Sequence, residues 1–192
     1  MYTLKTERLI LRPFEIGDVA FLDHLHSDVD VTRYTSGKTR SHAENVTYIM
    51  SMLELYMRDI GHLLVVRKSD GQPIGRCGLY TFYGINDGVQ DWYYFPGPQS
   101  VKKSGEIFEL IELGYSFARD HWGHGYATEA ATAVRDYAFD QLNYERLSSL
   151  VIKENTPSIR VAQKMGAAVS INCMLNERPA INLIQQRSSK AL

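Results

Sequence analysis

One stretch of the chain, ELGYSFARDHWGHGYATEAA from Glu112 to Ala131, joins a strand pattern to a helix pattern through two glycines. Gly123 and Gly125 have no side chain that could cover the neighbouring backbone amides. The helix pattern that begins near Ala127 directs unpaired N–H groups and the positive end of its dipole toward this turn. The turn is therefore predicted to bind an anion, although an isolated G-x-G is also typical of an ordinary tight turn.

The length and charge of the chain limit what else it can be. Its 192 residues suit one domain over residues 1–192 with a sizeable core. With 21 Lys and Arg against 22 Asp and Glu, the net charge is −1. This balance gives no reason to expect nucleic acid or an anionic membrane as a partner, so the anion site must be local. The sequence shows neither an apolar run of ~18 residues nor a signal peptide, and a cytoplasmic protein is the expectation.

The cysteines and histidines do not have the spacing of metal ligands. Cys77 and Cys173 lie far apart, and they are predicted to be small buried residues in a reducing compartment. No carboxylates or thiolates converge with the histidines in the pattern, so no metal is expected. Four histidines are instead predicted to lie on the surface or to stabilise loops: His24, His26, His121 and His124.

Hydrophobic periodicity predicts an α/β chain. The Asp70-Gly71 pair indicates a hairpin, and Ser41 with Glu44 indicates a capping box. Strands are predicted at 4–14, 62–68, 73–80, 107–117 and 147–152, followed by two terminal strands around 176–179. Helices are predicted at 18–26, after Ser41, at 127–142, and from Thr156 as N-cap and Pro157 as N1 to Gly166 as C′.

Residues 83–105 break this pattern with glycines and prolines around four consecutive aromatic residues, Trp92 to Phe95. The pattern indicates a long loop or an irregular hairpin extension, and loops of this length in compact domains are usually functional or mobile. We expect Trp92 and Tyr94 to contact a substrate. The sequence leaves open that the cluster covers the sheet or joins two copies in a homodimer.

Several motifs together resemble the GCN5-related N-acetyltransferase (GNAT) superfamily, and within it the branch of ribosomal-protein N-terminal acetyltransferases. They follow one another in the family's order along nearly the whole chain, as TERLILRPF, ELGY, WGHGYATEA, and ENTPS followed by KMGA. The resemblance implies a mixed, mostly antiparallel sheet that is splayed at its centre and has helices on both faces. It also implies acetyl-CoA as the co-substrate and direct acetyl transfer to a primary amine.

The resemblance also implies where the cofactor binds. Backbone donors of the turn would hold its pyrophosphate, and two splayed strands at 112–117 and 147–152 would hold its pantetheine arm. Asn155 matches the family's side-chain contact, and the sequence equally allows it to be a turn residue. The other residues assigned to the cofactor are Tyr115, Phe117, Trp122, Gly123, His124, Gly125, Tyr126, Ala127 and Thr128.

The catalytic residues are less sharply indicated. Glu112 lies on the central strand, where family members often carry a base, while Glu109 and Glu177 are its rivals. An α-amine, with a pKa near ~7.7 to 8.0, needs only a modest base. Many relatives have a tyrosine donor for the departing thiolate where this chain has Ala162, so Ser158 is the predicted substitute or else a capping residue.

The acceptor remains open between a protein N-terminus and a small molecule such as a polyamine, an amino acid or an antibiotic. The missing tyrosine also suits a catalytically silent acyl-CoA-binding module. A dinucleotide-binding Rossmann domain fits poorly, because its glycines would follow the first strand.

Overall fold

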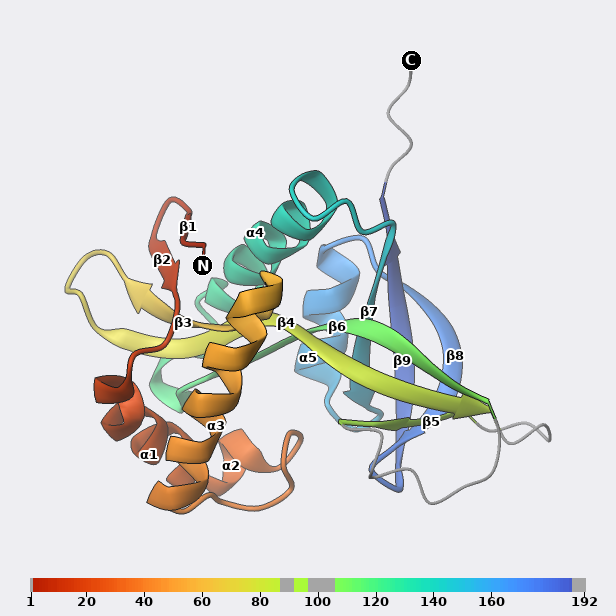
Figure 1. Ribbon diagram of the computed structural model, residues 1–192, viewed down its shortest axis with the longest axis horizontal. Helices are drawn as coiled ribbons and strands as arrows, with labels where there is room; N and C mark the ends of the chain where they lie inside the picture. The colour runs from red at the N-terminus through yellow and green to blue at the C-terminus, as the bar shows by residue number, and fades with distance from the viewer. Residues whose placement is uncertain (1, 87–91, 97–105, 188–192) are drawn as a thin grey trace. The chain divides into compact units, whose positions relative to one another are not determined.

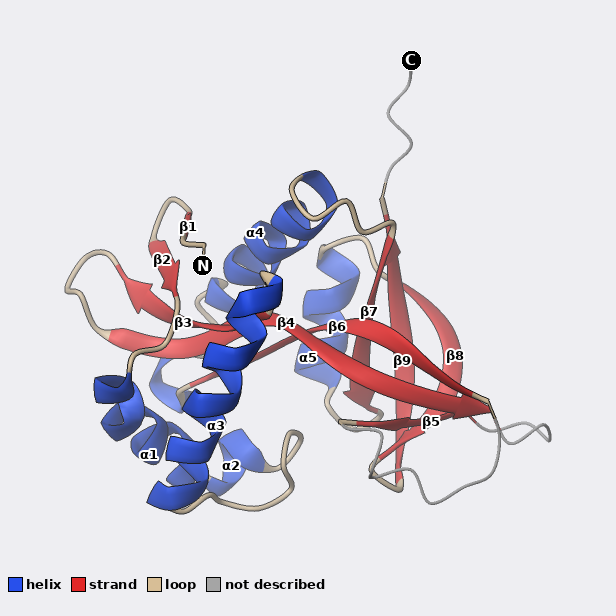
Figure 2. Cartoon of the chain, in the orientation of Figure 1, coloured by secondary structure: helices blue, strands red, loops and turns tan. Residues whose placement is uncertain are grey.

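The computed structural model describes residues 2–86, 92–96 and 106–187. The chain divides into two compact units, residues 1–79 with 114–134 and residues 80–113 with 135–192. The boundaries fall inside β4 (Pro73–Asn86), β6 (Ile107–Phe117) and α4 (Tyr126–Asp140), so each of these three elements has residues in both units. Figure 1 shows the course of the chain, and Figure 2 its strands and helices.

The first unit combines antiparallel strands with helices. Strand β2 pairs with β1 and β3, and β3 pairs with β4, always antiparallel. Helix α3 contacts both α1 and β3. Besides parts of β4, β6 and α4, this unit contains β1 (Leu4–Lys5), β2 (Leu9–Arg12), η1 (Ile16–Asp18), α1 (Val19–Ser27), α2 (Val29–Thr32), α3 (His42–Leu55), η2 (Tyr56–Arg58), β3 (Gly61–Arg67) and η4 (Arg119–His121).

Local sequence signals in the first unit act as predicted. The Ser41 side chain accepts from the Glu44 amide, and the Glu44 carboxylate accepts from the Ser41 amide, which confirms the capping box of α3. Gly71 has a φ of +70° in the turn between β3 and β4, which confirms the hairpin at Asp70-Gly71. The predicted strand at 4–14 is in fact two short strands, β1 and β2. Helix α2 was not predicted, because four residues are too few to show a helical period.

The second unit is a mixed sheet with α5 (Thr156–Lys164) packed on it. The end of β4 pairs antiparallel with β5 (Trp92–Phe95), and β5 runs parallel to β8 (Ala168–Leu175). Strand β9 (Arg178–Gln186) lies antiparallel to both β8 and β7 (Arg146–Ile152). Helix α5 covers the face of β7 and β9 with Ala162, against Val151 and Leu183.

The structure answers the alternatives at 83–105 in part. Residues 83–86 belong to β4, and Trp92–Phe95 form the strand that pairs with it, so the hairpin reading holds for these residues. Residues 87–91 and 97–105 lie outside the described residues. Cys77 and Cys173 are buried and unbridged, as predicted.

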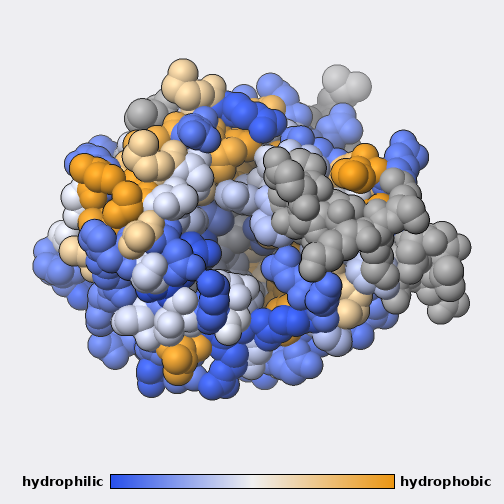
Figure 3. Space-filling model, turned by 60° about the horizontal axis from the view of Figure 1, so that its bottom comes forward, coloured by the Kyte–Doolittle hydropathy of each residue, from blue (hydrophilic) through white to orange (hydrophobic). Residues whose placement is uncertain are grey.

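The face drawn in Figure 3 carries apolar side chains among hydrophilic ones. Figure 3 shows one face, on which orange apolar groups alternate with blue hydrophilic ones. Such scattered residues are ordinary on a protein surface and do not by themselves mark an interface. None of the helices in the described part of the chain has the length and apolar composition to cross a membrane.

Candidate functional site

The glycine turn lies between η4 and α4 in the first unit. Gly123 has a φ of +78° and Gly125 a φ of +80°, a region that residues with a Cβ rarely adopt. A Cβ on Gly123 would meet nothing within 4 Å, so the backbone conformation rather than space requires glycine there. The Glu129 amide donates to the Gly125 carbonyl over 3.1 Å, and the amides that precede it are the donors that a helix start leaves open.

Arg8 of the first unit holds the start of α4 against the residues that precede β2. Its backbone amide and its Nε both donate to the Glu129 carboxylate, over 2.8 and 2.6 Å. Its Nη1 donates to the His124 carbonyl inside the turn over 3.0 Å. Thr6 adds a hydroxyl donor to the same carboxylate at 2.5 Å. Burial alone would raise the pKa of Glu129, but the hydrogen bonds from Thr6 and Arg8 outweigh it and lower that pKa.

Aromatic rings line the turn. The ring of His124 stacks on Tyr126 with centroids 5.8 Å apart, and Arg8 Cζ lies 4.6 Å from the centroid of Tyr126. The His124 Nδ1 donates to the carbonyl of Trp122 over 2.7 Å. Trp122 itself is 46% exposed, and its indole N–H donates to the Phe117 carbonyl over 2.7 Å. Trp122 therefore ties the turn to the end of β6 while it keeps a large apolar face in solvent.

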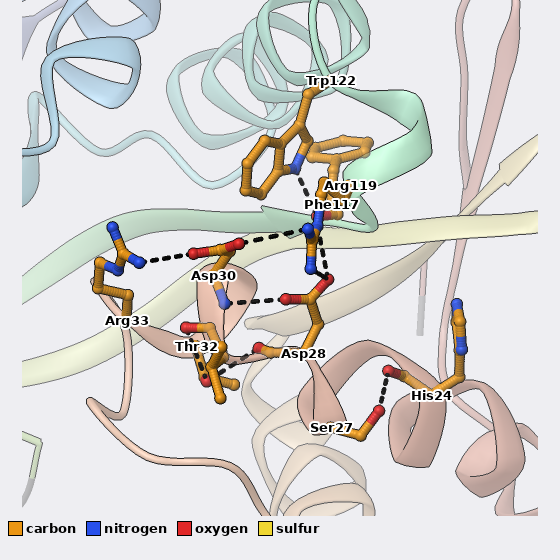
Figure 4. Close-up of polar contacts among 10 residues, drawn as sticks. His24, Ser27, Asp28, Asp30, Thr32, Arg33, Phe117, Arg119 and Trp122 are labelled. Atoms are coloured by element: carbon orange, nitrogen blue, oxygen red, sulfur yellow. Dashed lines mark hydrogen bonds and ion pairs between the residues drawn. The ribbon is translucent and has the colours of Figure 1, made fainter.

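An ion-pair network fixes the approach to this turn, as Figure 4 shows. Arg119 of η4 donates from Nε and Nη2 to Asp28 Oδ2, over 2.9 and 2.7 Å. Asp28 also caps α2, because its Oδ1 accepts from the Asp30 amide. Asp30 in turn pairs with Arg33 at 2.6 Å. The helix that the sequence did not reveal is thus tied to the segment that leads into Trp122.

In the second unit, strands β6 and β7 run parallel and share one register pair among the described residues, Glu112 with Ser148. Beyond it, the Ser149 hydroxyl donates to the Leu113 carbonyl over 3.5 Å, a side chain in place of a backbone donor. On its other side β7 pairs with β9 along all seven residues. The two central strands are therefore splayed, as the family resemblance implied.

Helix α5 begins at the end of β7, and its cap differs from the prediction. The Asn155 side chain accepts from the Ser158 amide over 3.3 Å, so Asn155 is the N-cap, and Thr156 is the first helical residue. The prediction of Thr156 as N-cap and Pro157 as N1 is therefore wrong by one residue. Asn155 and Thr156 are adjacent and both residue types are good caps, so the sequence alone does not decide between them. Gly166 follows the helix with a φ of +88°, as expected for C′.

The candidate carboxylates occupy different settings in the second unit. Glu112 is half-buried, while Glu109 on the same strand is exposed. Glu177 is exposed and has a φ of +64° in the turn between β8 and β9. Successive strand residues face opposite sides of a sheet, so Glu112 and Glu109 point to opposite faces. Glu112 shares its face with Ser148, its register partner.

The aromatic residues of β5 pack on β6 within the second unit. The rings of Trp92 and Tyr94 meet Phe108 with centroids 5.4 and 6.2 Å apart. Gly84 makes room for Phe108, whose ring lies 2.2 Å from where a Cβ of Gly84 would be. Tyr94 is 2% exposed, and its hydroxyl accepts from Asn182 Nδ2 over 3.2 Å. Burial raises the pKa of Tyr94. Trp92 is half-buried and is the more accessible of the two predicted substrate contacts.

The structure brings the predicted turn residues together in the first unit. Five other predicted site residues belong to the second unit, namely Glu112, Asn155, Ser158, Trp92 and Tyr94. Sequence reasoning missed the clamp of Arg8 and Glu129. Both residues stand inside quoted motifs, TERLILRPF and WGHGYATEA, so the pairing of two motifs far apart in the chain was the available signal. No group of three or more possible metal ligands occurs in the part of the chain that the structure describes.

Two curated relatives resemble this sequence over most of its length. The N-acetyltransferase p20 of Bacillus licheniformis is 32% identical over 168 residues, which are 86% of this chain and 82% of p20. The spermidine N(1)-acetyltransferase of Escherichia coli K12 is 26% identical over 159 residues, 83% of this chain and 72% of that protein.

Solved structures show the same fold. An acetyltransferase from Agrobacterium tumefaciens C58 superposes with a TM-score of 0.75 at 24% identity, covering 97% of this chain and 95% of that one. RimL, a ribosomal L7/L12 alpha-N-protein acetyltransferase in complex with coenzyme A, gives a TM-score of 0.70 at 14% identity, covering 96% and 98%.

The sequence pattern of the acetyltransferase (GNAT) domain matches residues 8–168, a span that contains the glycine turn, the Arg8 clamp and the splayed strands. With that match and with relatives named as N-acetyltransferases, the chain belongs to the GNAT family and is an N-acetyltransferase.

Proposed function

We propose that the protein transfers the acetyl group of acetyl-CoA to a primary amine by direct attack. The observation that carries the proposal is the splay of β6 and β7 after a single register pair in a chain of the GNAT family. Backbone N–H and C=O groups along such a gap have the spacing that an amide-bearing arm can pair with, in the manner of an added strand. The pantetheine arm of acetyl-CoA carries two amides.

The glycine turn supports the phosphate part of the proposal. Gly123 and Gly125 adopt positive φ, and no side chain stands at the Cβ position of Gly123. Successive backbone amides at a helix start bind phosphate oxygens without needing a positive protein. We assign the pyrophosphate to the amides of residues 123–128 and the exposed face of Trp122 to the rest of the nucleotide arm. Arg8, whose Nη2 lies 3.5 Å from a Cβ built on Gly125, would add a cation beside them.

The chemistry needs a neutral amine and a proton for the thiolate. In the step, the neutral amine nitrogen attacks the thioester carbonyl, the C–N bond forms, and the C–S bond breaks. The proton that the nitrogen then loses replaces the one that the departing thiolate receives, so the products are the amide and CoA thiol. We assign removal of the ammonium proton to Glu112, directly or through water, because it is half-buried and lies at the one register pair of the gap. We assign donation to the departing thiolate to Ser158, in the first turn of α5.

The acceptor that we favour is a protein N-terminal α-amine, because its proton is lost more easily than that of a lysine or polyamine amine. Structural neighbours include RimL, which is described as an alpha-N-protein acetyltransferase. A small amine is the second candidate, supported by the match to a spermidine N(1)-acetyltransferase over 83% of this chain. Of the predicted substrate contacts, we keep Trp92 as the one that an acceptor would touch.

An acceptor screen tests the proposal. Purified protein is mixed with acetyl-CoA and with one acceptor at a time, a peptide with a free N-terminal Ser or Ala, spermidine or an aminoglycoside, and free CoA is measured. The same peptides with blocked N-termini are the matched controls. We expect CoA release above hydrolysis with the free peptides and none above it with the blocked ones. Release with spermidine alone would move the assignment to small amines, and no release with any amine while acetyl-CoA still binds would favour the silent acyl-CoA-binding module.

A further inference from the structure

The first unit contains a second group of polar side chains that the glycine turn does not use. Arg76 lies on β4 with 6% of its surface exposed, and His26 lies near the end of α1 with 1% exposed. Both lie near the ring of Tyr48, whose centroid is 5.4 Å from Arg76 Cζ and 6.0 Å from that of His26. The prediction that His26 lies on the surface or stabilises a loop is therefore wrong, because its ring is part of the core.

Arg76 is a buried cation without a carboxylate partner among the residues that the structure describes. Its Nη1 donates to His62 Nδ1 over 3.0 Å, and its Nε is buried without an acceptor. By contrast, the guanidinium of Arg12 donates to both oxygens of Asp18. A guanidinium keeps its charge when buried, and leaving such a charge without a counter-ion is costly. We therefore expect an anion bound beside the guanidinium of Arg76 to stabilise the protein.

The histidines nearby do not compensate the charge. Burial, and after it the charge of Arg76, lowers the pKa of His62 well below its ordinary value and that of His26 to about 3. Both rings are therefore neutral near pH 7. A second guanidinium, that of Arg40, lies 5.1 Å from the centroid of Tyr48. Arg40 and Tyr48 are partly exposed, so they connect the buried group with the surface.

The second buried atom in this group without a hydrogen-bond partner among the described residues is Nε2 of His26. Asn45 Nδ2 donates to Asp23 Oδ1 over 2.8 Å, which leaves Asn45 Oδ1 as the acceptor for His26 Nδ1 at 2.7 Å. The Nδ1 of this neutral ring must then carry the proton, and Nε2 presents a lone pair. That Nε2 is buried and has no donor. The cluster thus holds one buried donor that needs an acceptor, on Arg76, and one buried acceptor that needs a donor.

We propose that Arg76, Arg40 and His26 form a binding site for an oxyanion group that also carries a hydroxyl, namely monoprotonated phosphate, free or as a monoester. The anionic oxygen accepts from Arg76 Nε, and the hydroxyl donates to His26 Nε2. Arg40 adds a second cation at the partly exposed side, and Tyr48 and His62 hold the two arginines in place. A carboxylate satisfies Arg76 but has no hydrogen for His26, so it is the weaker ligand.

The test measures thermal unfolding and calorimetric binding with inorganic phosphate, acetate or chloride at equal ionic strength, without CoA. Phosphate should raise the unfolding midpoint of the wild type above that in chloride, and acetate should bind about tenfold or more weakly than phosphate. Arg76→Met should weaken phosphate binding by about tenfold or more, and Arg33→Met, at an exposed arginine, should leave it unchanged. Equal midpoints of the wild type in phosphate and chloride would overturn the site, as would full phosphate binding by a folded Arg76→Met protein.

A readout on the wild type covers the case in which Arg76→Met does not fold. In protein with ¹⁵N-labelled histidine, the Nε2 resonance of His26 should shift on addition of phosphate and stay unchanged with acetate. A resonance that does not respond to phosphate would remove His26 from the site. Binding of glycerol phosphate would assign the site to a monoester, and binding of inorganic phosphate alone would assign it to the free anion. The glycine turn of the proposed function can also bind phosphate, so Arg76→Met and the His26 resonance, rather than the midpoint of the wild type alone, assign the binding to this cluster.

Discussion

At the residue scale, a dihedral angle rather than a lack of space makes Gly125 hard to replace. We expect Gly125→Val to weaken acetyl-CoA binding by about tenfold or more, roughly 1.4 kcal/mol, because a φ of +80° strains the valine and its side chain crowds the phosphate. Gly71→Val is the matched control, since Gly71 has a φ of +70° in the β3–β4 hairpin. Calorimetry on the folded variants should show the loss only at Gly125. An unchanged affinity there would exclude the turn as the phosphate site.

Asn155 and Ser158 both lie at the start of α5, and kinetic measurements can separate their roles. Ser158→Ala should lower turnover more than cofactor affinity, while Asn155→Ala should do the reverse. Asn155→Ala should also cost about 1 kcal/mol of unfolding free energy, because Asn155 caps α5. Thr156→Ala, which the structure places after the cap, is the control for stability. Full turnover of Ser158→Ala under conditions where chemistry limits the rate would leave Ser158 without a catalytic role.

Glu112 can be tested through the pH dependence of turnover. Glu112→Gln removes the proposed base, so turnover near pH 7 should fall about 10²-fold and recover in part as pH rises toward the pKa of the amine. Glu109→Gln changes an exposed carboxylate on the opposite face of the same strand and should behave like the wild type. If Glu112→Gln matches the wild type at every pH, the base must be sought at Glu109 or Glu177.

Single residues also show where sequence reasoning stops. The glycines of the turn could be identified, since only certain residues tolerate positive φ and the surrounding motif is long. The buried cluster at Arg76 could not, because its members are spread over α1, α3, β3 and β4 and no local pattern marks an arginine as buried. The same limit applies to His26, which stands on the helix with no sign that its ring enters the core.

At the scale of elements, the clamp between Arg8 and Glu129 gives a prediction with a definite sign. The folded-state pKa of Glu129 lies below the ordinary 4.5, so its contribution to stability is present above pH 4.5 and is lost as pH falls through the folded pKa. Glu129→Gln should therefore cost about 1–2 kcal/mol of unfolding free energy near pH 7, and this difference should shrink below pH 4.5. Urea unfolding at several pH values measures it, with Glu7→Gln, at an exposed carboxylate, as the control. A difference that does not change with pH would mean that the charge of Glu129 does not matter.

Most elements could be predicted because each has a local cause. Periodicity gave α1, α3, β6 and α4, and turn chemistry gave the β3–β4 hairpin. What failed depends on pairing between distant residues. At Trp92–Phe95 the sequence left a loop and a hairpin extension open, because only the pairing of β5 with β4, which continues to Asn86, decides between them. Helix α2 is held by Asp28 and Arg119, which are 91 residues apart.

At the scale of the whole molecule, the two units share three continuous elements, β4, β6 and α4. Unfolding one unit breaks elements that continue into the other, so we expect a single cooperative transition, in line with the predicted single domain over residues 1–192. Scanning calorimetry should give equal calorimetric and van't Hoff enthalpies. Two separate transitions would show that the units are independent domains.

The family could be recognised from the sequence because its motifs are distributed along the chain in a fixed order. The acceptor could not, because recognition of an acceptor depends on side chains that converge from several elements, and no local pattern marks them. Cytoplasmic location and a homodimer remain predictions.

The separation of β6 and β7 also affects the time for which the folded protein stays free of aggregation. Strand β7 is paired along all seven residues on the side of β9 and at one residue on the side of β6, as far as the structure describes them. An open strand edge is a template on which a second extended chain can add itself. A bound pantetheine arm would occupy that edge. Protein purified free of cofactor should therefore aggregate sooner during storage than the same protein saturated with acetyl-CoA. The metabolic supply of the acetyl donor would then govern the working life of the enzyme as well as its rate.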